Sequence, residues 1–329
     1  MSIKSENNEG LILIIDALNL FMRHFVAHPA VNINGEHAGG IVGFLYSVID
    51  MVERFNPASV IIVWEGGGSV RRRNIYSDYK MKRRPESLNR FYEDDIPDTV
   101  ENRNRQISLI VEIMKKTSAL QMYVPDCEAD DVIAYLSMYR FKNNRKLIMS
   151  SDKDFYQLLD SKTIIYSPTW KKLVSSKDVI DKFCISPENF ALAKSVCGDT
   201  SDNISGVKGV GFKTLAKRFP TMSLPATVSI DTLVDESREM IADGSKIKAF
   251  QNIVISENII RRNWKLIYLD TSCLAATQIK KINYLIDTFK PNKNKLEVMK
   301  ILIKEGLQTF NVDRMFLAFN SVGAQSWKT

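Results

Sequence analysis

The chain has 329 residues, of which 45% are hydrophobic and 25% charged, with a formal net charge of +7 and a pI near 9.0. This length supports a sizeable core and one or two domains, and the basic balance favours a polyanionic partner such as nucleic acid. Four scattered cysteines and three histidines argue against a disulfide framework and a histidine-rich zinc site. No apolar run is long enough for a membrane span, so we expect a cytoplasmic protein with no membrane partner.

Short apolar runs alternate with amphipathic helical patterns in the first half of the chain. The runs "LILIID", "SVIIVWE" and "RKLIMSSD" each read as a buried strand that ends in an acidic residue. Helical patterns lie between them over 40–54, 102–117 and 126–140. This alternation predicts an α/β fold with a central, mostly parallel sheet flanked by helices, followed by a helical, lysine-rich C-terminal region.

Acidic residues gather where the predicted strands end and the predicted helices begin. Each one alone has an ordinary explanation as a helix cap or turn residue. Together they form a set too large for that explanation, because crowded carboxylates repel one another unless cations neutralise them. Mg²⁺ prefers oxygen ligands, and two such ions can serve phosphodiester hydrolysis. The candidate metal ligands are Asp16, Glu65, Glu128, Asp130, Asp131, Asp152, Asp154, Asp199 and Asp202.

A basic run follows the second predicted strand. Between Ser69 and Arg90 it contains eight basic residues and only two acids, with Tyr76 and Tyr79 among them. Basic residues neutralise phosphates and aromatic rings stack on bases, although a solvated helical face is the simpler alternative. We expect an insertion over the active edge, acting as a lid or gate. Its basic residues include Arg71, Arg72, Arg73, Lys80, Lys82, Arg83 and Arg84.

The stretch "ISGVKGVGFKTLAKRF" is rich in glycine and runs into a basic helix. Glycines allow the backbone to approach a phosphate closely, which indicates a helix-hairpin-helix element at about 196–219 that binds duplex backbone. An ordinary turn between two helices is the alternative. The candidate DNA-binding residues here are Gly206, Gly209, Gly211, Lys213 and Thr214.

Five stretches in this order resemble the structure-specific 5′ nucleases. They read "LIIDALNLFMRHF", "VIIVWEGGGSVRRRNIYSDYKMKRR", "CEADDVIAYL", "SSDKDFYQLL" and "VCGDTSDNISGVKGVGFKTL". That family includes flap endonucleases, the 5′-nuclease domain of bacterial DNA polymerase I, and stand-alone phage enzymes such as the T-even type ribonuclease H. The resemblance implies a PIN/5′-nuclease-like α/β core over 1–185, a helical arch inserted at about 66–100, and a helical DNA-binding region over 186–329.

The resemblance also implies roles for particular residues. Asp16, the acid after the second strand, Glu128 and Asp130 match the family's first metal site. Asp152 and Asp154 match acids at the junction with the second site, and Asp199 and Asp202 complete it. Lys80 and Arg83 match gateway residues at the scissile phosphate, which places them with Asp130 and Asp152 among the catalytic candidates. Arg23 lies where the family has a residue near the substrate.

The implied activity is 5′-3′ exonuclease and flap endonuclease cleavage of DNA flaps, nicks and RNA–DNA primers in replication. The implied cofactors are two or more Mg²⁺ ions, for which Mn²⁺ substitutes, and K⁺ at the glycine hairpin. We expect a monomer, with a single-strand binding protein or sliding clamp as further partners. One departure is Glu65-Gly66, where the family usually has Asp-Gly. Two alternatives stay open: a PIN-like ribonuclease and a catalytically impaired DNA-junction-binding protein.

Overall fold

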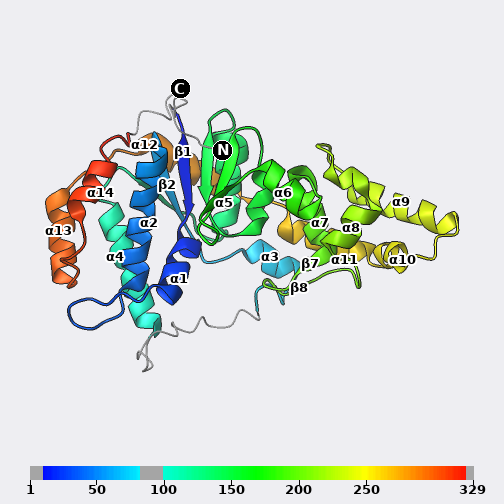
Figure 1. Ribbon diagram of the computed structural model, residues 1–329, viewed down its shortest axis with the longest axis horizontal. Coiled ribbons are helices and arrows are strands. Elements are labelled where there is room, and N and C mark those ends of the chain that lie inside the picture. The colour runs from blue at the N-terminus through cyan, green and yellow to red at the C-terminus, as the bar shows by residue number, and fades with distance from the viewer. Residues whose placement is uncertain (1–9, 82–98, 324–329) are drawn as a thin grey trace.

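The computed structural model describes residues 10–81 and 99–323, and its centre is a six-stranded sheet (Figure 1). The strand order is β3-β2-β1-β4-β5-β6, and β6 alone in this sheet runs antiparallel to its neighbour. The expectation of a mostly parallel α/β sheet is therefore confirmed. The strands are β1 (Ile12–Asp16), β2 (Ser59–Trp64), β3 (Leu120–Tyr123), β4 (Lys146–Met149), β5 (Thr163–Ser167) and β6 (Lys172–Val174).

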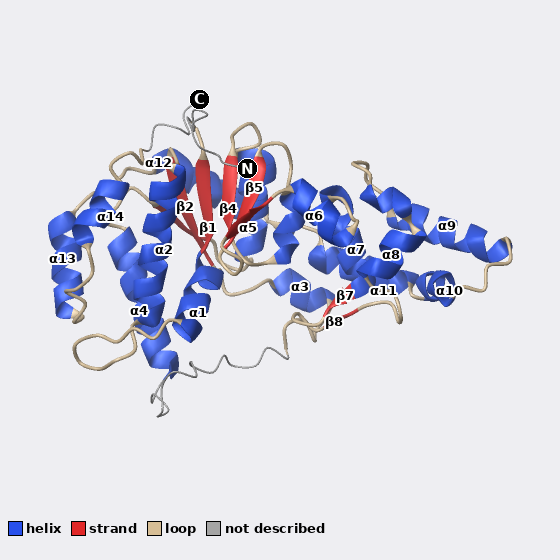
Figure 2. Cartoon of the chain, viewed as in Figure 1, coloured by secondary structure: helices blue, strands red, loops and turns tan. Residues whose placement is uncertain are grey.

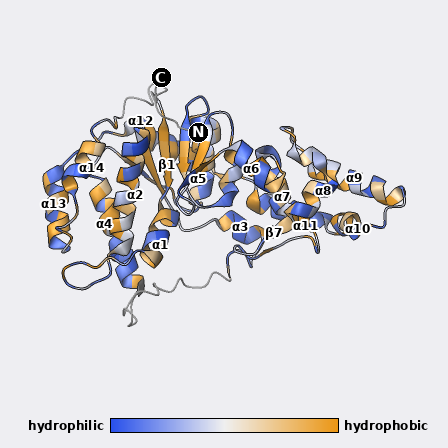
Figure 3. Cartoon of the chain, viewed as in Figure 1, coloured by the Kyte–Doolittle hydropathy of each residue, from blue (hydrophilic) through white to orange (hydrophobic). Residues whose placement is uncertain are grey.

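Strand β1 is apolar from Ile12 to Ile15 because both faces of the sheet are covered. Ile12 and Ile14 belong to the core on one face, and Leu13 and Ile15 to the core on the other. All four are 0% exposed, and each contributes about 2 kcal/mol relative to an exposed side chain. Figure 3 shows the strands as the most hydrophobic part of the molecule.

Helices cover both faces of the sheet (Figure 2). The predicted helices over 40–54, 102–117 and 126–140 are observed within three residues of these bounds, since a π-helical turn continues the last of them. Strands β3, β5 and β6 were not predicted, because they are short and carry polar residues. The helical elements of this part are α1 (Ala17–Ala27), α2 (Gly39–Phe55), α4 (Thr99–Met114), α5 (Ala129–Tyr135), η1 (Leu136–Arg140) and η2 (Lys153–Leu158).

A helical extension projects from one side of the sheet (Figure 1). Its helix α11 returns towards the sheet and packs against α7. The elements of the extension are α6 (Ser176–Phe183), α7 (Pro187–Cys197), β7 (Gly198–Asp199), β8 (Ile204–Ser205), α8 (Phe212–Arg218), η3 (Pro220–Ser223), α9 (Ile230–Ala242), α10 (Lys248–Ile255), α11 (Glu257–Ile267) and η4 (Thr271–Cys273).

The last helices do not stay with this extension. They are α12 (Ala276–Thr288), α13 (Lys295–Lys304) and α14 (Val312–Ala318). Val298 and Met315 belong to the same core as strand residue Leu13, and Ile282 of α12 belongs to the core on the opposite face. The helical region expected over 186–329 is therefore divided in space between the extension and the flanks of the sheet.

The insertion after β2 begins with the short helix α3 (Val70–Ile75), which packs against α11. Residues 82–98 lie outside the described residues, so the structure describes only the base of the expected arch. None of the helices within the described ranges is long and apolar enough to cross a membrane.

Candidate active site

Three adjacent strands deliver acids to the carboxyl edge of the sheet. Asp16 ends β1, Glu65 directly follows β2, and Asp152 lies three residues beyond β4. Because β2, β1 and β4 are neighbours, these side chains reach one cavity of about 680 Å³, which Asp130 from the first turn of α5 joins. The polar residues of the cavity are Asp16, Asn19, Arg23, Glu65, Lys80, Asp130, Ser151, Asp152, Thr169 and Ser201.

Three carboxyl groups in this cavity, those of Asp16, Glu65 and Asp130, have a pKa above the ordinary value. Burial, opposed by a hydrogen bond from Ser150 and reinforced by the charges of Asp152 and Glu65, raises the pKa of Asp16 to about 7. Burial, followed by repulsion from Asp152, raises the pKa of Asp130 well above its ordinary value. The basic side chains nearby do not neutralise all of these carboxylates. A group of oxygen ligands with this excess negative charge suits a hard divalent ion.

Glu65 reaches across to the start of α5. Its carboxylate accepts hydrogen bonds from the backbone amides of Gly68 at 3.2 Å and Ala129 at 3.4 Å. Burial, and then the charge of Glu128, raises the pKa of Glu65. The glycine after it is sterically required, since a Cβ on Gly66 would lie 1.8 Å from a backbone carbonyl oxygen.

Glu128 is the N-cap residue of α5 and is 3% exposed. Its Oε2 accepts from Lys80 Nζ at 2.8 Å, the Tyr79 hydroxyl at 3.0 Å and Arg72 Nη1 at 3.3 Å. Burial opposes the charge, but Lys80 and Arg72 hold the pKa of Glu128 below its ordinary value. Tyr79 is buried in this contact, so it does not offer its ring to a base as the sequence suggested.

Asp131 and Arg72 bind each other, which differs from the roles expected for them. The sequence suggested metal binding for Asp131 and DNA binding for Arg72. Both side chains are 1% exposed, and they form a bidentate ion pair with two bonds of 2.7 Å. Both carboxylate oxygens of Asp131 are occupied by the guanidinium, and Arg72 does not reach the surface.

A second acidic group lies where the helical extension meets the sheet. One carboxylate oxygen each from Asp154, Asp199 and Asp202 lies within 4.8 Å of the other two. Asp154 belongs to η2 behind β4, whereas Asp199 and Asp202 follow α7. The two acids that are three apart in the sequence therefore do meet, together with an acid from the strand side.

Lys194 lies in the middle of this second group and was missed by the sequence reasoning. Its Nζ pairs with Asp154 and, at 2.6 Å, with Asp199. Burial raises the pKa of Asp154 to about 7 despite this cation, while Lys194 holds the pKa of Asp199 below its ordinary value against the effect of burial. A charge inside the apolar stretch "FALAKSV" was the available signal.

Lys80 connects the two acidic groups. Its Nζ lies 2.8 Å from Glu128 and 4.0 Å from Asp202, and its backbone amide donates to the Asp202 carbonyl at 3.0 Å. Burial opposes its charge, but the surrounding carboxylates raise the pKa of Lys80. Arg23 donates to Thr169 on the cavity wall.

Of the other basic residues expected in the insertion, the structure describes Arg71 and Arg73. Arg73 is exposed on α3, and Arg71 contacts the Lys265 carbonyl at 3.3 Å. The expected gateway residues Lys82, Arg83 and Arg84 lie outside the described residues.

The glycine-rich loop joins α7 to α8 and has two kinds of glycine. A Cβ on Gly206 would lie 2.1 Å from the Cys197 carbonyl oxygen, so this glycine permits close packing. Gly209 and Gly211 have nothing within 4 Å of an added Cβ, so their backbone is open. The expected Lys213 is exposed and Thr214 is half-buried on α8 behind the loop.

A mostly parallel sheet with one acidic group at its carboxyl edge, a second beside it, a lysine between the two and another inside the second defines a nuclease-like α/β protein. Residues 11–184 match the family described as 5′-3′ exonuclease, N-terminal resolvase-like domain. The chain belongs to this family, as the sequence motifs predicted.

Individual proteins of similar sequence and structure agree with this assignment. The 5′-3′ exonuclease of Aquifex aeolicus (strain VF5) is 31% identical over 205 residues, which are 62% of this chain and 66% of that protein. The thermostable DNA polymerase I of Thermus aquaticus is 31% identical over 237 residues, 71% of this chain but 27% of the polymerase. The match therefore spans about two thirds of the exonuclease and about a quarter of the polymerase. The structure of T5 D15 protein co-crystallised with metal ions superimposes with a TM-score of 0.66 at 21% identity, over 88% of this chain and 99% of that one, which confirms the 5′-nuclease-like fold.

Proposed function

We propose that this protein is a divalent-metal-dependent, structure-specific 5′ nuclease with 5′-3′ exonuclease and flap endonuclease activity. The observation that carries the proposal is the meeting of Asp16, Glu65, Asp130 and Asp152 in one cavity at the sheet edge. Acids that repel one another there are stabilised when a cation of higher charge lies among them. Family membership and a structural neighbour described as a T5 flap endonuclease in complex with DNA and metal ions support the choice of substrate.

Two sets of acids would hold the metal ions. Asp16, Glu65, Asp130 and Asp152, which line the cavity, form the first set together with Glu128, whose charge acts on Glu65 and Asp130. Asp154, Asp199 and Asp202 form the second. We assign Mg²⁺ to both, with Mn²⁺ as a substitute. Bound metal lowers the pKa of a coordinated water and stabilises a leaving oxygen. We leave Asp131 out of both sets, because Arg72 occupies its carboxylate.

Basic residues beside the acids would bind and orient the scissile phosphate. Lys80 lies between the two acidic sets, so its ammonium is placed to donate to a phosphate oxygen there. Arg83, from outside the described residues, is proposed for the same task. Arg23 and Arg73, with Lys82 and Arg84, would bind the flanking strands.

The glycine-rich loop is proposed to bind the duplex as a helix-hairpin-helix element. The open backbone at Gly209 and Gly211 would meet a phosphate, directly or through K⁺, with Lys213 and Thr214 beside it. RNA–DNA hybrids as substrates, a monomeric state, a cytoplasmic location and partners such as a single-strand binding protein or sliding clamp belong to the same proposal.

The decisive experiment is cleavage of a 5′-labelled DNA flap in Mg²⁺. We expect short labelled products that disappear in EDTA and in an Asp152→Ala/Asp154→Ala variant. A matched double variant, Asp235→Ala/Asp313→Ala, removes two exposed acids far from the cavity and should cut like the wild type.

Other outcomes identify the alternatives. Tight flap binding without cleavage in Mg²⁺ or Mn²⁺ would identify a junction-binding protein. Cleavage of single-stranded RNA in place of the flap would identify a PIN-like ribonuclease. Either result would refute the proposal.

A further inference from the structure

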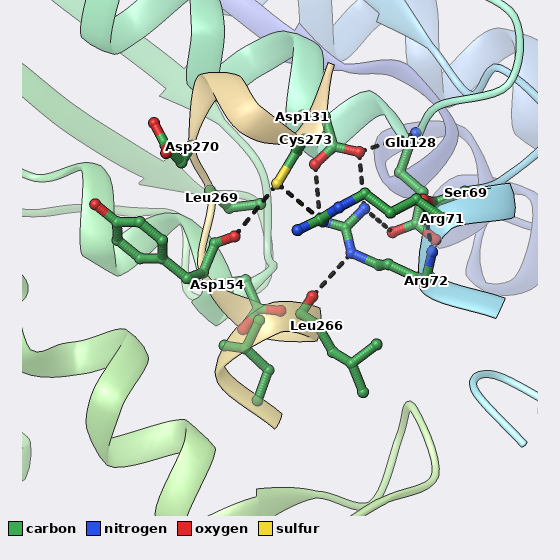
Figure 4. A network of polar contacts seen from close by, with 12 residues as sticks. Ser69, Arg71, Arg72, Glu128, Asp131, Asp154, Leu266, Leu269, Asp270 and Cys273 are labelled. Carbon is green, nitrogen blue, oxygen red and sulfur yellow. Dashed lines mark hydrogen bonds and ion pairs between the residues drawn. The ribbon is translucent and has the colours of Figure 1, made fainter. Parts of the chain in front are cut away.

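The short helix α3 carries a buried arginine to which the proposed chemistry assigns no task. Arg72 is 1% exposed, and each of its two terminal nitrogens donates to one carboxylate oxygen of Asp131 at 2.7 Å (Figure 4). Its Nη1 also donates to Oε2 of Glu128 at 3.3 Å, and its Nε donates to the Leu266 carbonyl at 2.8 Å. Four hydrogen bonds in three directions leave this guanidinium little freedom to move.

The Leu266 carbonyl belongs to the last turn of α11, where helix carbonyls lack partners within the helix. Its neighbours in that turn are also bound from outside the helix. Arg71 Nη1 donates to the Lys265 carbonyl at 3.3 Å, and Gln157 Nε2 donates to the Ile267 carbonyl at 3.1 Å. The C-terminal end of α11 is therefore fixed by α3 and η2.

The same helix is joined to the glycine-rich loop. The Asn263 side chain is 0% exposed and donates to the Ser195 carbonyl at 2.9 Å and the Ser205 carbonyl at 2.8 Å. Ser205 directly precedes Gly206. Helix α11 thus connects the loop proposed to bind duplex to the arginine that contacts Glu128.

Three donors hold one carboxylate oxygen of Glu128. Arg72, Tyr79 and Lys80 all donate to Oε2. We propose that Arg72 is a positioning residue, which fixes the Glu128 carboxylate relative to the end of α11 in the orientation that binds metal. This inference rests on the proposed function.

A purely structural role is the competing explanation. Buried ion pairs usually add little net stability, because desolvating the charges offsets their attraction. A positioning role makes a further demand, since residues that orient metal ligands change metal affinity and turnover by about 10–100-fold when altered. Metal binding therefore separates the two explanations.

The test is Arg72→Lys, which keeps the charge and removes the bidentate geometry and the Nε bond. The control is Arg105→Lys, because Arg105 also pairs with two acids, Glu36 and Glu305, but does not line the cavity. Mn²⁺ binding to the metal-free protein is measured by titration calorimetry, and flap cleavage is followed in Mg²⁺. We expect Arg72→Lys to bind Mn²⁺ about 10-fold more weakly and to lower kcat by about 10–100-fold with KM within threefold, while Arg105→Lys stays within threefold throughout.

The outcomes separate this inference from the proposed function. Wild-type Mn²⁺ affinity and kcat in a folded Arg72→Lys protein, even one of lower stability, would overturn the positioning role. If the wild type binds Mn²⁺ and cuts no flap, the proposed function fails, whereas weaker Mn²⁺ binding by Arg72→Lys still supports positioning. If Arg72→Lys does not fold, Asp131→Asn replaces it. That variant frees Arg72 to bind Glu128 more closely, so unchanged Mn²⁺ affinity there would equally refute the inference.

Discussion

Lys194 is an internal cation in the second acidic group, and its removal should destabilise the protein when no metal is bound. Its side chain is 9% exposed, beside Asp154 at 13% and Asp199 at 18%. Removing one partner of a fully buried ion pair costs about 3–5 kcal/mol. Because both acids keep some contact with solvent, we expect Lys194→Met to lower the free energy of unfolding by about 2–3 kcal/mol at pH 8 without metal.

Metal should reverse about half of this loss. In the wild type Lys194 competes with the metal for Asp154 and Asp199, and in Lys194→Met it does not. Mn²⁺ at 100 times the variant's Kd stabilises the variant by about 2.7 kcal/mol, and the same concentration stabilises a wild type that binds about 10-fold more weakly by about 1.4 kcal/mol. The difference between variant and wild type should therefore shrink by about 1.3 kcal/mol in Mn²⁺.

The assay is thermal unfolding at pH 8 in EDTA and in Mn²⁺. At roughly 2 °C per kcal/mol for a chain of this size, the loss in EDTA is about 5 °C. Lys146→Met is the matched control, since Lys146 is also buried but donates to the Phe141 and Asn144 carbonyls and to no acid. An equal loss for Lys194→Met in EDTA and in Mn²⁺ would refute the reasoning.

Two further predictions concern the titration of Asp16 and the two kinds of glycine in the glycine-rich loop. Burial raises the pKa of Asp16 to about 7, so the folded state binds this proton more tightly than the unfolded state. Without metal, the free energy of unfolding should fall between pH 4 and pH 7, by at most about 4 kcal/mol from this group, and equal slopes for wild type and Asp16→Asn in denaturant titrations would contradict this. Gly206→Ala should lower stability by about 2–3 kcal/mol because its Cβ meets the Cys197 carbonyl. Gly211→Ala should change stability by less than about 0.5 kcal/mol yet weaken DNA binding, and equal stability of the two variants would argue against this packing.

Some features of this protein follow from the sequence alone. The runs at β1, β2 and β4 are mostly apolar because both faces of the sheet are covered, and an acid ends or follows each of them. Parallel strands have their carboxyl ends at one edge, so the meeting of Asp16, Glu65 and Asp152 could be predicted without a structure. The order of the five motifs was enough to identify the family.

Other features were decided only by tertiary packing. In the sequence "EADD", Asp130 and Asp131 are equally plausible metal ligands. The helix directs Asp130 into the cavity and Asp131 towards Arg72, which is 59 residues away in the chain. Lys194 meets Asp154 across 40 residues, and no local pattern specifies that distance. The return of α12 to α14 to the sheet depends likewise on which apolar faces remain uncovered after the core has formed. Local sequence places a charge at the end of a strand or helix, and only the packed structure determines whether its partner is a metal, a lysine or an arginine.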